Sequence, residues 1–392
     1  MARLLYLTPG PVPPSADPER AVYFHFGARG EHTVDVLCPV WWRSNEEGLA
    51  NYPGSDFPTV RLGPVTYHFE LEYQHAPALR TLARIRFYLR KGTELGRQGP
   101  PIDAIICYGT NTVGLCSILL ARRLGARLIP EIPGVPAKAF VLDTPRPSVK
   151  NRLRLKLATR LLHAVVKRAS GVHTLFPGQV PESLLGHVPV RRISHSFVPI
   201  SLIPQSNTDE RFVLFLGFPW YLKGVDLLIE AFRSIADAVP DVRLRIVGHF
   251  PDREELERRV AGHPRISIEK AVKVPVAHDL ISRCSVLVLP SRTEAMGRVL
   301  LEAMAAGKPV VASRVDGIPH YVTHEANGLL FECGHVEDLA HQLRRVLTDR
   351  DLAHRLGHTG HAMVREKWSE ERFSEVWEEL ILGALARPGA RR

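Results

Sequence analysis

The chain has 392 residues, of which 45% are apolar and 23% charged, and its formal net charge is +10. This length predicts two to three domains, and the composition is ordinary for a globular protein. No run of 18 apolar residues is present, so no membrane-spanning helix is expected. The first apolar run breaks at Pro9, too soon for a signal peptide. Five cysteines without close pairs favour reduced thiols in a cytosolic protein over a disulfide framework or a zinc site.

Strands alternate with helices through residues 1–205, which is typical of a parallel sheet covered by helices. Strands are expected at Leu4–Leu7, Thr33–Cys38, Ala104–Cys107, Arg127–Ile129, Gly171–Leu175 and Arg191–Phe197. Helices are expected at Leu79–Gln98, Thr112–Leu124 and Lys150–Arg168. Residues 41–66 carry turn-forming residues and no periodicity, which predicts a loop. The Pro-rich, polar residues 198–210 predict a link between two domains.

A basic stretch runs from Thr144 to Pro181, without a single Asp or Glu. In its expected helix, basic side chains share one face beside an apolar face that is expected to pack on the core. The basic face comprises Arg152, Lys156, Arg160 and Lys167, and the apolar face includes Leu153, Leu157 and Leu161. Two interpretations stay open: a solvated helix face, or contact with an anionic membrane surface. No aromatic residues interleave with these charges, so no nucleic acid partner is expected.

The second half of the chain alternates more regularly. Strands are expected at Arg211–Gly217, Val242–Val247, Ile266–Ile268, Val286–Leu289, Pro309–Ser313 and Asn327–Phe331. Helices are expected from Gly224 through Ala236, at Glu254–Ala261, Ala277–Ser282 and Val336–Leu347, and from Trp368 to Leu382. Asp349-Arg350-Asp351 has the form of a metal-binding motif, but no strand precedes it. Gly357 and Gly360 weaken a helix that would align His354, His358 and His361, so no metal site is predicted.

Two glutamates mark the segment from Ser291 to Ser313. Glu294 follows a strand that is apolar throughout, and Glu302 lies two turns into an apolar helix that ends at Gly307. Carboxyl ends of parallel strands are where doubly wound sheets bind ligands. The helix begins near Gly297, so free backbone N–H groups lie beside Glu294. This arrangement suits a phosphorylated ligand whose sugar hydroxyls need a carboxylate acceptor.

The same segment resembles the C-terminal domain of retaining glycosyltransferases of family 4, which have the GT-B fold. Their hallmark is a Glu, seven residues and a second Glu, followed by Ala-Met-Ala-Ala-Gly-Lys-Pro-Val-Val-Ala, and Glu294 to Ala312 fit it without a gap. A second match runs from Phe215 to Phe232, where the family has a strand, a glycine, a Lys-Gly pair and an apolar helix. The resemblance implies an α/β protein with two Rossmann-like, doubly wound domains facing a central cleft. The expected domains are residues 1–205 on the acceptor side, residues 206–370 on the donor side, and a helix at 371–392 that packs back on the first domain.

The resemblance also implies the roles of individual residues. Lys223 matches the lysine that contacts the donor's diphosphate, and a cation there would neutralise the charge of the leaving group. Glu294 matches the glutamate that contacts the donor sugar, and Lys223 and Glu294 are the expected catalytic residues. Glu302 matches the residue that binds the ribose hydroxyls. The donor site is expected to comprise Gly217, Lys223, Glu294, Met296, Gly297, Arg298 and Glu302, with no metal and no cofactor besides the nucleoside diphosphate sugar.

The chain departs from the family pattern at several positions. Phe218 stands where the family has an arginine, and Arg298 is a candidate replacement for that missing cation. Asp316 and His320 replace other family residues, and neither is given a role. The resemblance is specific over about residues 210–380 and only architectural over 1–205, so the acceptor stays unidentified.

Three functions therefore remain open. The leading hypothesis is a retaining glycosyltransferase acting on an unidentified polysaccharide, lipid-linked or small-molecule acceptor, in the cytoplasm or at the inner face of the membrane. The alternatives are a nucleotide-sugar epimerase of the same fold and a non-catalytic protein that binds a nucleotide sugar. The sequence does not distinguish among nucleotide bases or donor sugars.

Overall fold

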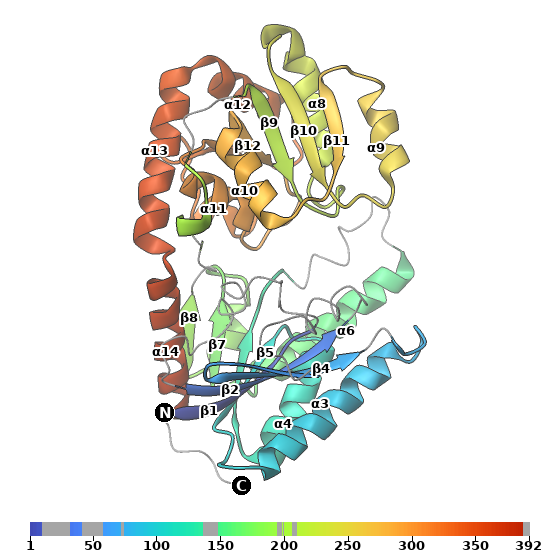
Figure 1. The fold of residues 1–392 in the computed structure, drawn as a ribbon, viewed down its shortest axis with the longest axis vertical. Helices are drawn as coiled ribbons and strands as arrows, with labels where there is room; N and C mark the ends of the chain where they lie inside the picture. Colours follow the sequence, from blue (N-terminus) through green and yellow to red (C-terminus); the bar gives the residue numbers. More distant parts are fainter. Residues whose placement is uncertain are drawn as a thin grey trace.

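The computed structural model describes residues 1–9, 32–40, 58–71, 74–135, 148–193, 198, 200–205 and 210–386. These residues form two α/β lobes, each built on one sheet (Figure 1). Most of the expected loop at 41–66, the end of the strand expected at Arg191–Phe197 and part of the 198–210 link lie outside the described residues.

The first sheet has eight strands in the order β3-β4-β2-β1-β5-β6-β7-β8. All its pairs are parallel except the β3–β4 pair. Its strands are β1 Ala2–Leu7, β2 His32–Val40, β3 Thr59–Leu62, β4 Val65–Leu71, β5 Ala104–Tyr108, β6 Arg127–Glu131, β7 Gly171–Thr174 and β8 Val190–Ile193. Its helices are α3 Arg80–Arg97, α4 Thr112–Leu124, α6 Val149–Val166 and the short α7 Glu182–Leu185.

Helices cover both faces of this sheet, and alternate residues of each strand supply the two cores. Leu5 and Leu7 of β1 pack with residues of α3, α4 and α6. Leu4 and Tyr6, which point the other way, pack with Trp377 of the last helix, α14 Glu370–Leu385. This explains why the strands read as nearly continuous apolar runs in the sequence.

The hairpin of β3 and β4 corrects one expectation. Residues 59–62 and 65–66 belong to these strands, although residues 41–66 were expected to be loop. Turn-forming residues dominate that stretch, so the short alternation of apolar and polar residues on either side of Gly63 did not predict strands. Long-range pairing decides the outcome, because β4 runs parallel to β2 along its whole length and buries Val65, Tyr67 and Phe69.

The second sheet has six parallel strands in the order β11-β10-β9-β12-β13-β14. They are β9 Phe212–Leu216, β10 Arg243–Gly248, β11 Ile266–Lys270, β12 Val286–Leu289, β13 Val310–Ser313 and β14 Leu329–Phe331. The helices are α8 Val225–Ile235, α9 Arg253–Val260, α10 Val274–Arg283, α11 Arg298–Ala305, α12 Val336–Thr348 and α13 Arg350–Lys367. Strand order reverses between β9 and β12, which makes the carboxyl ends of these two strands the switch point of the sheet.

Helix α6 departs from the sequence expectation in its orientation. Its buried residues are Ala158, Leu162, Val165 and Val166. Leu153 and Leu157, which were expected to face the core, are 69% and 58% exposed, and Val149 one turn earlier is 83% exposed. Because the buried residues of α6 all lie in its second half, the first half exposes an apolar row beside its basic side chains.

Helix α14 returns the chain to the first sheet (Figure 1). Trp377 is fully buried there, with its ring 4.6 Å from that of His173 in β7. A hydrogen bond between His32 and Glu378 at 2.7 Å and an ion pair between Arg192 and Glu379 at 2.9 Å hold the same helix. The last helix is therefore part of the first lobe's core.

Helix α13 is continuous over 18 residues despite its two glycines. A Cβ on Gly357 would lie 2.1 Å from the carbonyl oxygen of Gly307, and one on Gly360 would lie 3.0 Å from a side-chain carbon of Met304. The glycines, expected to weaken this helix, instead allow its close approach to α11. Asp349, from the apparent metal-binding motif, caps α13 by accepting a hydrogen bond from the Leu352 amide.

We predict that Gly357→Ala destabilises the second lobe, although alanine favours helix by about 1 kcal/mol. The added methyl group meets a backbone oxygen, and overpacking of this kind costs about 1–3 kcal/mol. Gly360→Ala is the control, because the flexible Met304 side chain can move away. Urea unfolding of both variants checks this, and equal midpoints would show that the close approach is not required.

Candidate functional site

The candidate site lies at the switch point of the second sheet. Gly217 directly follows β9, and Lys223 lies in the loop between β9 and α8. Glu294 lies in the loop between β12 and α11. Because β9 and β12 are neighbours, both loops leave the same edge of the sheet. Three of the residues expected from the sequence are thus positioned by adjacent strands.

Lys223 and Glu294 contact each other directly. The Lys223 ammonium donates a short hydrogen bond to Glu294 Oε2, and both side chains are largely buried. The Ser291 hydroxyl donates to the same carboxylate oxygen at 3.4 Å. The carboxylate therefore holds the lysine between the two loops.

The loop that carries Lys223 is fixed by contacts that the sequence did not reveal. Arg292 makes a two-pronged ion pair with Asp226, at 2.8 and 2.7 Å, and its guanidinium lies 4.0 Å from the ring centroid of Tyr221. Gly224 has φ +68°, and a Cβ there would lie 2.0 Å from the carbonyl oxygen of Pro290. Only glycine permits the two loops to approach this closely.

Asp316 fixes the loop that carries Glu294. Its carboxylate accepts hydrogen bonds from the Thr293 hydroxyl and from the Glu294 amide, the latter at 3.1 Å. The Gly317 amide returns a bond to the Glu294 carbonyl at 3.1 Å, and a Cβ on Gly317 would lie 1.8 Å from the Ala295 carbonyl oxygen. Asp316, which received no role from the sequence, is therefore a positioning residue.

Helix α11 positions Glu302 and Arg298. Gly297 precedes the helix in the left-handed conformation, with φ +59°. Arg298 Nε lies 3.1 Å from Glu302 Oε1, and the buried His278 approaches the same oxygen at 3.9 Å. The Met296 side chain is buried in the core, so this residue can meet a ligand only through its backbone. Its carbonyl accepts a hydrogen bond from the Tyr321 hydroxyl.

No arginine takes the position of Phe218. This side chain is 49% exposed, and its ring lies 5.5 Å from that of His249. Phe218 lies in the same loop as Lys223, and His249 directly follows β10, the strand that neighbours β9. Arg298 pairs with Glu302 in this structure, and its role as a replacement cation stays a prediction.

Residues of the first lobe approach the site from their own strand ends. Phe176, just after β7, stacks on His320 with ring centroids 5.6 Å apart. Burial and the Glu131 charge raise the pKa of Tyr108, at the end of β5, and the Arg298 charge opposes this in part. His320, a departure from the family pattern, thus has a structural contact between the lobes.

Glu131 is a buried carboxyl group that the sequence left without a role. It ends β6, accepts a hydrogen bond from the Tyr6 hydroxyl at 2.9 Å and lies 3.9 Å from His173 Nδ1. Burial raises its pKa to about 7, and the Tyr6 hydrogen bond opposes this only in part. An acidic residue at the carboxyl end of a strand with an apolar centre was the available sequence signal.

Among the described residues, no three His, Cys, Asp or Glu side chains come together in a way that could hold a metal ion. The five cysteines are separate thiols, and only Cys333 is not fully buried. No helix in the described part of the chain is long and apolar enough to cross a membrane.

The second lobe is similar in sequence to known proteins. Residues 201–363, which carry the second sheet, match the model of the family described as glycosyl transferases group 1. A stretch of 137 residues is 34% identical to the sulfoquinovosyl transferase SQD2 of Arabidopsis thaliana, covering 34% of this chain and 27% of that protein. The chain spans about half or less of the length of the curated relatives it matches. The sequence similarity to this family thus lies in the second lobe.

Solved structures match over nearly the whole chain. Sucrose-phosphate synthase from Thermosynechococcus elongatus superimposes with a TM-score of 0.79 at 18% identity, covering 98% of this chain and 99% of that one. Anabaena HepE, solved in complex with UDP, has a TM-score of 0.68 at 17% identity, covering 97% and 99%. These similarities confirm the predicted fold class, the GT-B arrangement of two Rossmann-like α/β domains.

We predict that stability depends on the protonation of Glu131. Its pKa is near 7 in the folded chain and near 4.5 when unfolded, so the folded state binds the proton more tightly. The contribution is present below about pH 4.5 and is lost as pH rises through 7, by up to about 3 kcal/mol. Glu131→Gln should therefore gain unfolding free energy relative to wild type as pH rises from 5 to 8. Parallel pH profiles of the two proteins in urea unfolding would contradict this.

Proposed function

We propose that this protein is a retaining glycosyltransferase that moves a sugar from a nucleoside diphosphate sugar to an acceptor. The observation that carries the proposal is the Lys223–Glu294 pair at the switch point, within a domain that matches glycosyl transferases group 1. HepE, which shares the fold, was solved with UDP, and this supports a nucleotide-linked donor.

The charged residues of the site have separate roles toward the donor. The leaving group is a nucleoside diphosphate, and its developing negative charge meets the Lys223 ammonium and the free amides at the start of α11. The largely buried carboxylate of Glu302 on α11 accepts hydrogen bonds from the ribose hydroxyls. Glu294 aligns the donor sugar and keeps Lys223 in place. These groups supply the neutralisation without requiring a metal ion.

In the proposed step, the bond between the anomeric carbon and the diphosphate oxygen breaks. The acceptor oxygen forms the new bond on the same face of the sugar, and its proton passes to the departing phosphate oxygen. No covalent enzyme intermediate forms, and the anomeric configuration is retained. Lys223 must therefore stabilise charge in the transition state more than in the bound donor.

One observation favours an alternative. Phe218 removes a cation that the family places beside the diphosphate, and the half-exposed Phe218–His249 pair occupies that side of the loop. A protein with this loop could bind a nucleotide sugar without turnover. An epimerase of the same fold would act on the nucleotide sugar alone.

A panel of uridine, guanosine and adenosine diphosphate sugars, with and without glycan acceptors, tests these functions. We expect release of nucleoside diphosphate that depends on acceptor, and a loss of kcat of about a hundredfold or more in Lys223→Ala. Lys367→Ala, an exposed lysine on α13, is the matched control. Epimer formation without acceptor, or binding without turnover, would favour the alternatives. Normal turnover by folded Lys223→Ala would remove the proposed role of the lysine.

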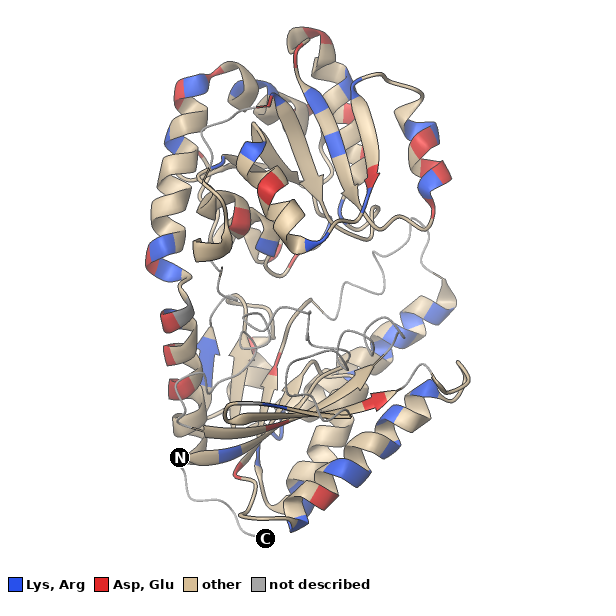
Figure 2. Cartoon of the chain, in the orientation of Figure 1, with Lys and Arg blue, Asp and Glu red and all other residues tan. Residues whose placement is uncertain are grey.

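We also propose that α6 rests on an anionic membrane surface, which would place the enzyme at the cytoplasmic face. The helix has five Lys or Arg residues and no acid (Figure 2), and its apolar row Val149, Leu153 and Leu157 is exposed. Basic side chains flanking an exposed apolar row are the features of an interfacial helix.

Vesicle sedimentation tests this contact. Replacing Arg152, Lys156, Arg160 and Lys167 by Gln should abolish binding to vesicles that contain phosphatidylglycerol, and wild-type binding should fall steeply with salt. Changing Leu153 and Leu157 to Ser should weaken binding at every salt concentration, because it removes the apolar contribution. Donor affinity should not change, since the donor site lies in the other lobe. Equal binding of wild type to neutral and anionic vesicles would refute the proposal.

A further inference from the structure

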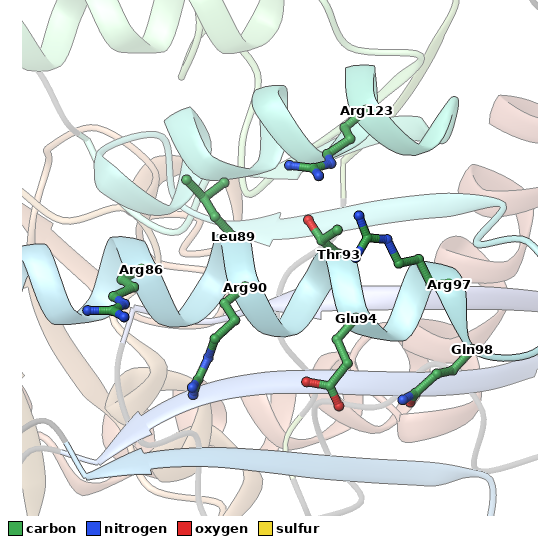
Figure 3. Close-up of a pocket in the computed structure, with 8 residues that line it drawn as sticks. All are labelled: Arg86, Leu89, Arg90, Thr93, Glu94, Arg97, Gln98 and Arg123. Atoms are coloured by element: carbon green, nitrogen blue, oxygen red, sulfur yellow. The ribbon is translucent and has the colours of Figure 1, made fainter.

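A groove on the outer surface of the first lobe is separate from the donor site. It lies along α3 where that helix packs beside α4, and its volume is about 530 Å³ (Figure 3). Four arginines line it: Arg86, Arg90 and Arg97 from α3, and Arg123 from α4. The candidate donor-site residues all belong to the second lobe, so neither Lys223 nor Glu294 contributes to this groove.

The charge of the groove is largely uncompensated. Arg86, Arg97 and Arg123 form no ion pair with any described residue, and Arg90 lies 4.0 Å from the nearest carboxylate oxygen, that of Glu70. Glu94 is the only acid in the lining, and Lys91 neutralises it at 2.7 Å, which lowers its pKa. Across α3 and α4 together, eight residues are Lys or Arg and one is acidic. A cluster of this sign attracts anions.

Thr93 supplies an independent indication of a ligand. Its side chain is 8% exposed, and its buried hydroxyl has no hydrogen-bond partner. Figure 3 shows Thr93 and Arg97 on the side of α3 that faces α4, with Arg123 reaching toward them from α4. A buried hydroxyl without a partner costs free energy, and an acceptor oxygen held by the two arginines would satisfy it.

We propose that this groove binds a phosphate group. The Arg97 and Arg123 guanidiniums would each donate to phosphate oxygens, and the Thr93 hydroxyl would donate to the same group. Planar guanidinium forks match phosphate oxygens, and charge-assisted bonds of this kind are the strong ones. The phosphate belongs either to a lipid headgroup or to a soluble phosphorylated ligand, and the chemistry of recognition is the same in both cases.

Titration with inorganic phosphate, followed by calorimetry, tests the site. The double variant Arg97→Gln, Arg123→Gln should bind phosphate at least about tenfold more weakly, since each charged hydrogen bond is worth about 1.5–3 kcal/mol. Arg122→Gln is the matched control, because Arg122 precedes Arg123 on α4 and is equally exposed but does not line the groove. Unchanged affinity in the double variant would overturn the proposal.

Thr93→Val separates a ligand-binding hydroxyl from a structural one. Valine keeps the shape and removes the unpaired oxygen, so the ligand-free protein should melt at a higher temperature while phosphate binding weakens. A lower melting temperature together with normal phosphate affinity would show a structural hydroxyl and overturn this part of the site. UDP binding is measured in each variant and should not change, which separates failure here from failure of the glycosyltransferase proposal.

Vesicles identify the source of the phosphate. Phosphatidylcholine vesicles with and without phosphatidylglycerol are sedimented with wild type and with the double variant. A loss of binding to anionic vesicles in the double variant assigns the groove to lipid headgroups. Unchanged vesicle binding, together with weakened binding of inorganic phosphate, assigns it to a soluble phosphorylated ligand.

Discussion

The ion pair between Lys223 and Glu294 joins the two loops that leave the switch point of the second sheet. A cation and a carboxylate meet at this edge because neighbouring parallel strands bring their loops to one place. The pair is possible only where backbones approach closely, as the missing Cβ of Gly224 and of Gly317 permits. The chemistry of the site therefore depends on the close packing of its loops.

Two side-chain networks keep that packing. The Arg292–Asp226 pair stiffens the lysine loop, and Asp316 bonds the backbone and side chain of the glutamate loop. Each network joins residues 22 to 66 positions apart in sequence. Both consist of charged or hydroxyl groups in semi-buried positions, where such bonds are stronger than in water. These networks position Lys223 and Glu294, the candidate catalytic residues, and are not themselves candidates for catalysis.

The first lobe is specialised in a different way. Its inner strand ends bring Glu131, Tyr108 and Phe176 toward the second lobe, whereas its outer helices concentrate positive charge. The α6 surface combines charge with exposed leucines, and the α3–α4 groove combines charge with a buried hydroxyl. We propose an anionic membrane interface for the first surface and a single phosphate group for the second. Part of the net positive charge of the chain is thus concentrated on the α6 surface and in the α3–α4 groove.

The sequence by itself determined most of the second lobe. Most of its strands and helices follow from local periodicity, although α13 was expected to be weakened by its glycines. Glu294 and Glu302 lie on one strand–loop–helix unit, as the sequence predicted. Helix Thr112–Leu124 was also predicted with the bounds that the structure shows. The Lys223 loop followed from a resemblance that extends over one continuous segment. All these signals are short in range.

Tertiary structure decided what depends on distant partners. Only pairing with β2 makes a strand of Val65–Leu71, and only the approach of α13 to Gly307 explains Gly357. The role of Asp316 depends on a loop 22 residues away, and the exposure of Leu153 depends on where α6 leaves its neighbours. Periodicity shows that a helix has an apolar face, but the packing of other elements decides how much of that face is covered.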